Sequence, residues 1–208
     1  MRKMTRFAKP AAIVTTAFVA YAGALIALRP WHTRWGATDE ELSKRLPGDE
    51  LAPNGAVCNH AITIHAPVSE VWKWLVQIGQ DRAGFYSYTW LENLFLCGMH
   101  NADRIVPEWQ RLRKGDSVRL ASKKVYGDIP LLHVGAIEPE HYLILEGWGT
   151  FVLEPIDTET TRMIIRSHGT KPMGGWLLNF FFWDPAHFIM ERGMLLGIKR
   201  RAEQRFAC

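Results

Sequence analysis

The chain has 208 residues, of which 48% are hydrophobic and 22% are charged, a composition typical of globular proteins and unlike that of disordered or fibrous ones. Its net charge of +4 arises at the N-terminus: residues 1–34 hold six basic residues and no acidic one, which leaves 19 basic against 21 acidic residues in the rest of the chain. A slightly negative body argues against nucleic acid as a partner. The three cysteines, Cys58, Cys97 and Cys208, lack the CxxC and Cys/His spacings of zinc sites, although a single disulfide stays open. We expect one globular domain with no metal and no cofactor.

The first predicted element is a helix in the run AAIVTTAFVAYAGALIAL, eighteen uncharged residues from Ala11 to Leu28, which is just long enough to span a membrane. Four basic residues precede the run, and Arg29 and Arg34 follow it, so the positive-inside rule places the N-terminus in the cytoplasm and the domain on the outer side. We therefore predict a single-pass membrane protein with an anchor over residues 1–30. A cleaved signal peptide is the alternative, with small-x-small sites around Tyr21 and Gly23, and a buried helix is the third reading.

Residues 31–55 are polar and contain Pro-Gly and Pro-Asn-Gly turns, so they are predicted to link the anchor to a domain over residues 56–206. The domain is predicted to start with a strand over Val57–His65, followed by a helix that begins at Pro67 and has apolar residues at helical spacing. A second short helix is predicted near Tyr88–Leu96, with Trp90, Leu91, Leu94 and Phe95 as its apolar set.

The next part of the chain is predicted to form consecutive antiparallel strands. The runs lie at Ser117–Ala121, Leu131–Ile137, Tyr142–Trp148, Thr150–Pro155 and Thr160–Ser167, and turn residues separate them. In the last run Met163, Ile165 and Ser167 alternate with Arg162, Arg166 and His168, which predicts one inward face and one wet face. The final predicted element is a long helix to about Gln204, with Asp184 as its N-cap and Pro185 at its first position.

This order of elements is that of a helix-grip fold, and several stretches resemble the SRPBCC superfamily, the START and polyketide-cyclase-like proteins. The stretches are RWGATDEEL, LPGDEL, ITIHAPVSEVWKWLVQIGQDRAGFYSYTWLENL, NADRIVPEWQ, LRKGDSVRL, WGTFVLEP and TRMIIRS, spread over about residues 34–205. The resemblance implies an α+β helix-grip fold in which a curved antiparallel sheet wraps the long C-terminal helix and leaves a hydrophobic cavity. It implies no particular reaction, because members bind diverse apolar ligands and only some are enzymes.

We expect the ligand to lie between the C-terminal helix and the concave face of the sheet. The predicted ligand-binding residues are Tyr86, Tyr88, Trp90, Val118, Leu120, His133, Met163, Ile165, Ser167, Trp183, Phe188 and Leu195. Packing of the helices onto the sheet is the competing interpretation for the aromatic residues 85–90. The apolar run 176–183 is read either as a cavity lid or membrane-dipping patch, or as internal packing.

Other chemical features are weaker. His187 and Glu191 lie four apart on the last helix, and without a third ligand a surface hydrogen bond or ion pair is favoured over a metal. His133 lies in an apolar strand and is either a cavity base or, the favoured reading, a histidine without catalytic duty. Glu146 and Arg166 are read as a structural pair between neighbouring strands. No catalytic residue is assigned.

The sequence favours non-catalytic binding or transport of a hydrophobic small molecule or lipid by a membrane-tethered domain. The alternative is a cyclase- or dehydratase-like enzyme that acts on an apolar substrate through His133, Tyr86 or Glu146, and the third reading is an interaction module with a closed core. Titratable side chains that meet at one point would favour the enzyme, an apolar cavity the binder, and a filled interior the module.

Overall fold

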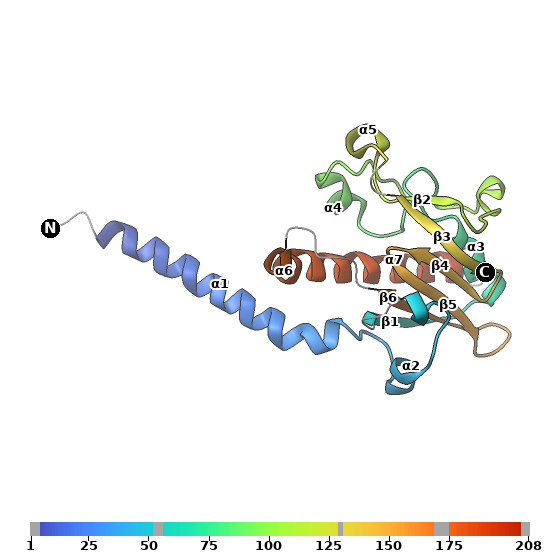
Figure 1. Cartoon of the computed structure of the whole chain (residues 1–208), viewed down its shortest axis with the longest axis horizontal. Coiled ribbons are helices and arrows are strands. Elements are labelled where there is room, and N and C mark those ends of the chain that lie inside the picture. Colours follow the sequence, from blue (N-terminus) through green and yellow to red (C-terminus); the bar gives the residue numbers. More distant parts are fainter. Residues whose placement is uncertain (1–4, 52–55, 129–130, 169–174, 205–208) are drawn as a thin grey trace.

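The computed structural model describes residues 5–51, 56–128, 131–168 and 175–204. In these ranges six antiparallel strands form one sheet in the order β1-β6-β5-β4-β3-β2, and a long C-terminal helix packs against it (Figure 1). The strands are β1 (Ala56–Ile64), β2 (Ser117–Arg119), β3 (Leu131–Glu138), β4 (Tyr142–Glu146), β5 (Gly149–Pro155) and β6 (Thr161–His168). The main helices are α1 (Thr5–His32), α2 (Asp39–Ser43), α3 (Val68–Val76), α4 (Thr89–Leu94), α5 (Lys123–Tyr126), α6 (Gly175–Leu178) and α7 (Asp184–Gln204). The predicted α+β helix-grip arrangement is confirmed.

The main core lies between the sheet and two helices, α3 and α7. Met163 and Ile165 of β6 point into it, as their alternation predicts, and have no exposed surface. Leu195 of α7 and Leu75 of α3 meet them from the other side and are also completely buried. The inner face of the sheet is therefore filled by apolar side chains along this part of α7.

The opposite face of β6 differs from the wet face predicted from the sequence, because residues 33–51 cover it. Arg166 donates to the Asp49 carboxylate at 2.7 Å, and Arg162 pairs with Glu41 at 2.6 Å. Leu46 packs beside them in a second apolar cluster. The strand alternation gives the direction of the two arginines correctly but does not show what covers them. Most of the segment predicted as a linker thus packs on the sheet.

The predicted Glu146–Arg166 pair does not form. The two residues lie on β4 and β6, and β5 runs between these strands. Glu146 is opposite His133 on β3, and Arg166 is opposite Thr150 on β5. The prediction failed because it assumed that the two strands are neighbours in the sheet.

The C-terminal helix starts earlier than Asp184. A turn of α-helix, α6, and a π-helical segment, η3 (Asn179–Trp183), lead directly into α7. Pro185 has no N–H to donate to the carbonyl of Phe181, four residues before it, and the Tyr21 hydroxyl of α1 donates to that carbonyl at 2.6 Å. A contact from another helix therefore satisfies the backbone group that the proline leaves free.

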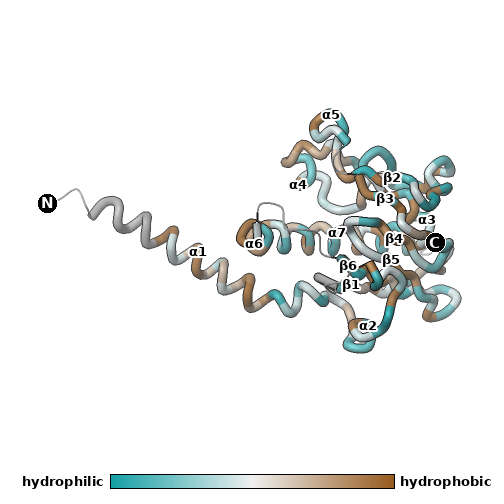
Figure 2. The backbone as a smooth tube through the Cα atoms, in the orientation of Figure 1, coloured by the Kyte–Doolittle hydropathy of each residue, from teal (hydrophilic) through white to brown (hydrophobic). Residues whose placement is uncertain are grey.

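The helix α1 extends away from the domain and meets it at η3, at the start of α7 and, through the His32 carbonyl, at β1 (Figure 1). Its segment Ile13–His32 is long and apolar enough to cross a membrane by length and composition, and few of its residues are buried. Hydrophobic residues occupy most of the described part of α1, and hydrophilic ones gather at its domain end (Figure 2). Arg29 in the last turn forms an ion pair with Asp184 at 2.5 Å.

Candidate functional site

The most unusual group in the described part of the chain is the carboxylate of Glu191, which lies on the inner side of α7 and has no exposed surface. Its Oε1 lies 2.5 Å from His60 Nδ1. Its Oε2 accepts hydrogen bonds from Trp148 Nε1 at 2.7 Å and from the Ser167 hydroxyl at 2.8 Å, and it lies 3.1 Å from His187 Nε2. We call Cys58, His60, Trp148, Ser167, His187 and Glu191 the Glu191 cluster. A buried charge needs this number of partners, because desolvation would otherwise cost several kcal/mol or more.

The strand β1 brings two members of the cluster to the face that meets α7. Cys58 and His60 are two residues apart, so both point to the same side of the strand, and both are buried. His60 Nε2 lies 2.7 Å from the backbone carbonyl oxygen of His32, at the end of α1. Phe188 packs edge-on against the His60 ring at 5.5 Å between centroids. The imidazole is thus fixed between the end of α1 and α7.

The helix α7 supplies the other pair, His187 and Glu191, one turn apart. His187 pairs with Glu191 and also interacts with the Cys58 thiol, and 41% of its side-chain surface is exposed. The sequence predicts this His187–Glu191 contact, but at the surface. The structure corrects its place: the carboxylate is inside the domain, and the imidazole connects it to solvent.

The charges of the cluster are coupled. Burial alone would raise the pKa of Glu191, but the charge of His187 and the hydrogen bonds from His187 and His60 outweigh it and hold that pKa below its usual range. Burial opposes the charged form of His187, yet Glu191 raises the pKa of His187 well above its usual value. Burial and the Glu191 charge raise the pKa of the Cys58 thiol. The carboxylate and the His187 imidazolium therefore form an ion pair beside a neutral thiol.

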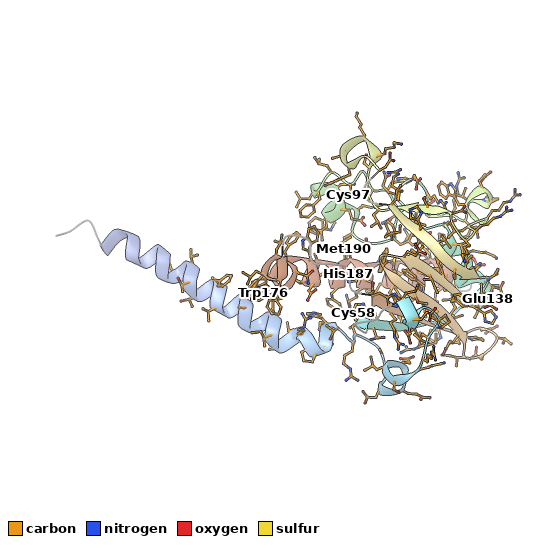
Figure 3. All side chains as sticks on the ribbon, viewed as in Figure 1. Cys58, Cys97, Glu138, Trp176, His187 and Met190 are labelled. Atoms are coloured by element: carbon orange, nitrogen blue, oxygen red, sulfur yellow. The ribbon has the colours of Figure 1, made fainter. Side chains whose placement is uncertain are left out.

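A small pocket reaches the cluster from the side of α1. It has a volume of about 20 Å³, and its lining residues are His32, Thr33, Cys58, His60, Asp184, His187 and Phe188. This volume holds roughly one water-sized molecule. Cys58 and His187 lie toward the end of the domain nearest α1, whereas Glu138 lies at the opposite end (Figure 3). A larger open recess of about 310 Å³ lies at the far end, around Val68, Glu140 and Asp157, away from the Glu191 cluster.

Apart from His133, which is exposed on β3, the predicted ligand-binding residues fall into three groups. Those packed in the core are Tyr86, Val118, Met163, Ile165 and Leu195, with Leu120 half-buried against them. Those at or near the small pocket are Ser167, in the Glu191 cluster, and Phe188. Those that are at least partly exposed at the end near α1 are Tyr88, Trp90 and Trp183. The three groups do not meet at one point.

His133 and Tyr86, two residues through which the alternative enzyme was expected to act, lie in different surroundings. His133 is exposed on β3, because Leu132 and Val134 on either side of it point inward. Tyr86 is buried, and its hydroxyl donates to the carbonyl of Trp74 at 3.0 Å. It lies directly against α7 at Gly197, where a Cβ would be only 2.0 Å from the Tyr86 carbonyl oxygen. Tyr86 therefore packs closely against α7 and helps to fix the position of this helix.

Cys58, His60 and Trp148 are the functional candidates that the sequence analysis did not select. The usable signal is the Cys-x-His spacing within a strand, which places both side chains on one face. This signal is weak by itself. Only the docking of α7 onto β1 brings these side chains to Glu191, 131 positions away from His60 along the chain.

No protein-family model and no curated protein matches this chain. Among solved structures, the chain is similar to a polyketide-cyclase-like protein of Corynebacterium glutamicum determined by NMR in solution. The two are 18% identical, the match covers 72% of this chain and 92% of that one, and the TM-score is 0.35. A likeness at this level carries no argument about ligand or reaction.

Proposed function

We propose that this protein is a membrane-anchored domain of the SRPBCC type that binds a hydrophobic small molecule or lipid at its membrane-facing end. One observation carries the proposal: η3 lies beside the middle of α1. The rings of Phe18 and Phe181 are 5.1 Å apart, and Tyr21 reaches the Phe181 carbonyl. The Arg29 guanidinium is 5.7 Å from the centre of the Phe180 ring, so η3 lies beside the domain-side half of the apolar segment, next to its charged end.

The side chains of this region suit a bilayer. Trp176 is 71% exposed, and Trp90 and Leu94 on α4 are 70% and 69% exposed. The ring of Phe95, directly after α4, is 5.9 Å from that of Phe182 in η3 and so connects the two regions. We call this the membrane-facing surface; its apolar members are Trp90, Leu94, Phe95, Leu96, Trp176, Leu177, Leu178 and Trp183. Exposed apolar patches of this kind mark membrane or ligand contacts.

The contacts at the end of α1 define where lipid would give way to water. Arg29 and Asp184 form their ion pair there, next to the small pocket that leads to His187. Charged groups are stable at the level of the headgroups and costly in hydrocarbon. A bound amphiphile would accordingly keep its apolar part against the membrane-facing surface and its polar end near Asp184 and His187.

We further propose that α1 is retained as the anchor, with the N-terminus in the cytoplasm and the domain outside. The basic residues before Ala11 support this orientation. The protein should stay in the membrane pellet after a carbonate wash, and a membrane-impermeant reagent added to intact cells should reach exposed lysines of the domain. Release into the supernatant, or a mature N-terminus at Gly23 or Leu25, would contradict the anchor.

Ligand retention tests the binding function. The full chain is purified from membranes in mild detergent, and its organic extract is analysed by mass spectrometry against an empty-detergent blank. We expect a stoichiometric apolar compound in the wild type and a several-fold loss in the W90K/W183K variant. I156K is the matched control, because Ile156 is an equally apolar side chain, 58% exposed, in the turn after β5. A wild-type extract equal to the blank would refute binding.

An enzyme acting on an apolar substrate is the second candidate, because four titratable side chains converge at Glu191. The pair of Glu191 and the half-exposed His187 is suited to proton transfer. If this reading holds, the E191Q variant should retain a different compound from the wild type, since a blocked enzyme keeps its substrate. The same compound in both preparations would leave binding as the function.

A further inference from the structure

Both ring nitrogens of His60 face oxygen atoms that accept hydrogen bonds. Nε2 lies 2.7 Å from the His32 carbonyl oxygen, and Nδ1 lies 2.5 Å from Glu191 Oε1. A neutral imidazole has one N–H, so it can donate to only one of these oxygens. When it donates to the carbonyl, the lone pair of Nδ1 points at the carboxylate. At 2.5 Å a shared proton fits between these two atoms; a metal ion bound to both would replace that proton and move them apart.

Further possible metal ligands surround the contact between His60 and Glu191. One ligand atom each of Cys58, His60 and Glu191 lie within 4.8 Å of one another, and all three residues are buried. His187 is outside this group of three but lies next to it: its Nε2 is 3.1 Å from the Glu191 carboxylate, and its imidazole interacts with the Cys58 thiol. Thiolate, imidazole and carboxylate are the ligands that zinc binds in proteins, with four donors in a tetrahedral arrangement.

The side chains that carry these donor atoms are held in fixed positions by the fold and by hydrogen bonds. Cys58 and His60 come from one face of β1, and His187 and Glu191 from one face of α7, so regular elements fix both pairs. The His32 carbonyl orients His60 through Nε2, while Trp148 and Ser167 both bind Oε2 of Glu191 and leave Oε1 toward His60. Such outer hydrogen bonds orient the ligands in known metal sites.

Charge and access agree with this arrangement. A divalent ion with one thiolate, one carboxylate and two neutral imidazoles is electrically neutral, which suits a buried position. The pocket of about 20 Å³ is lined by Cys58, His60 and His187, so it gives an ion a route from solvent and leaves room for one water-sized ligand.

We propose that Cys58, His60, His187 and Glu191 bind one divalent transition-metal ion, for which Zn²⁺ has the best-matched ligand preferences. The site goes beyond the proposed binding function and does not depend on it. It also departs from the expectation of no metal, because that expectation rested on cysteine spacing along the chain. Here each half of the site comes from a different element.

The test uses the full chain in detergent, stripped with a chelator and titrated with Co²⁺. The C97S/C208S background leaves Cys58 as the one cysteine of the sequence. We expect saturation at one Co²⁺ per protein, with a thiolate charge-transfer band in the near ultraviolet and tetrahedral bands in the visible. Zn²⁺ should displace the Co²⁺, and elemental analysis of the protein as isolated should show one metal per chain.

Variants then assign the ligands. C58S in the same background should remove the charge-transfer band, and H60A and E191Q should each weaken Co²⁺ binding by about tenfold or more. H133A is the matched control, because His133 is exposed on β3 and outside the Glu191 cluster. If these variants fail to fold, the titration of the background protein decides alone. A titration without stoichiometric binding or a thiolate band would overturn the proposal and leave a proton between His60 and Glu191.

Discussion

The two halves of α7 bury their inner faces against the same sheet in different ways. The half far from α1 packs Met194, Leu195 and Ile198 into an apolar core, where each residue is at most 1% exposed. The half near α1 carries His187 and Glu191, which meet polar side chains of β1, of the turn between β4 and β5, and of β6. The first arrangement gives stability through close packing. The second arrangement buries charged groups, which lowers stability, and proteins often retain such groups at functional sites.

The pocket beside α7 therefore lies at a different place from the cavity expected from the sequence. A ligand space between helix and sheet was predicted along α7, around Met163 and Ile165. The structure fills that part with apolar side chains, and the pocket that it does describe beside α7 opens at the polar half, next to the membrane-facing surface. The Glu191 cluster and the surface that we propose to face the membrane therefore lie at the same end of the domain, and the apolar core occupies the other end.

Removing the charge at the centre of the polar half should have the largest effect. E191A leaves His60, Trp148 and Ser167 without their shared acceptor, so we expect a loss of about 3–5 kcal/mol in the free energy of unfolding. Chemical denaturation of chelator-treated protein in detergent, followed by tryptophan fluorescence, measures it. E154Q is the control, since it breaks the exposed Lys44–Glu154 pair and should cost less than about 1 kcal/mol. A loss for E191A as small as that of E154Q would contradict the importance of the cluster.

A cavity in the apolar half should come next. L195A deletes a completely buried side chain of α7, and we expect it to cost about 2–5 kcal/mol by the same assay. I189A is the matched control on the same helix, because Ile189 is 44% exposed and its truncation should stay within about 0.5 kcal/mol. If L195A were as mild as I189A, this half of α7 would be loosely packed and the contrast between the halves would fail.

Overpacking distinguishes a filled core from a ligand space at the position that the sequence chose. Met163 has no exposed surface, so M163W should destabilise the domain by about 1–3 kcal/mol, and ligand retention should be measured on the same protein. A variant that is as stable as the wild type but has lost its ligand would mean that the space opens when a ligand enters.

These tests also separate what the sequence could predict from what it could not. Local periodicity gave the strands, the last helix and the inward direction of Met163 and Ile165, because alternation is a property of neighbouring residues. The same rule, applied to Leu132 and Val134, would have placed His133 outside. For His133 the apolar composition of the strand outweighed its phase in our prediction.

Contacts between distant segments were beyond prediction. The cover of β6 depends on Arg166 meeting Asp49, 117 positions earlier, and the Glu191 cluster depends on β1 meeting α7. No spacing in the sequence encodes either meeting. His187 and Glu191 were recognised as a pair because they lie on one helix, and their two partners on β1 were not, because they join the pair only in the folded protein.

The ion pair between Glu41 and Arg162 on the outer face should contribute less than Glu191, because it is closer to water. A hydrogen bond from Arg162 lowers the pKa of Glu41 against the opposing effect of burial. Its stabilisation is therefore complete above the ordinary carboxyl range, about pH 4–5, and disappears as the pH falls through the lower folded pKa. We expect E41Q to cost about 1–3 kcal/mol at pH 7, and the difference from wild type to shrink at pH 3 in thermal melts. Glutamine can keep the capping box with Thr38, but its NH2 group cannot accept from Arg162, so the substitution removes the charge together with one hydrogen bond. A difference that is the same at both pH values would show that the charge contributes nothing.

A substitution on the membrane-facing surface should have the smallest effect on stability. It should show most clearly whether this surface contacts lipid. W90S removes an indole that is 70% exposed, so the free energy of unfolding in detergent should change by no more than about 0.5 kcal/mol. The same change should reduce contact with lipid, because the indole would otherwise lie at the membrane interface. Hydrophobic photolabelling of α4 in liposomes, with the labelled peptide identified by mass spectrometry, measures that contact. I156S, at the other end of the domain, should leave the labelling unchanged. Equal labelling of α4 in the wild type and W90S would place this helix in water. The bilayer would then touch the protein through α1, α6 and η3 alone, and the ligand proposal would lose its α4 side while keeping Trp183.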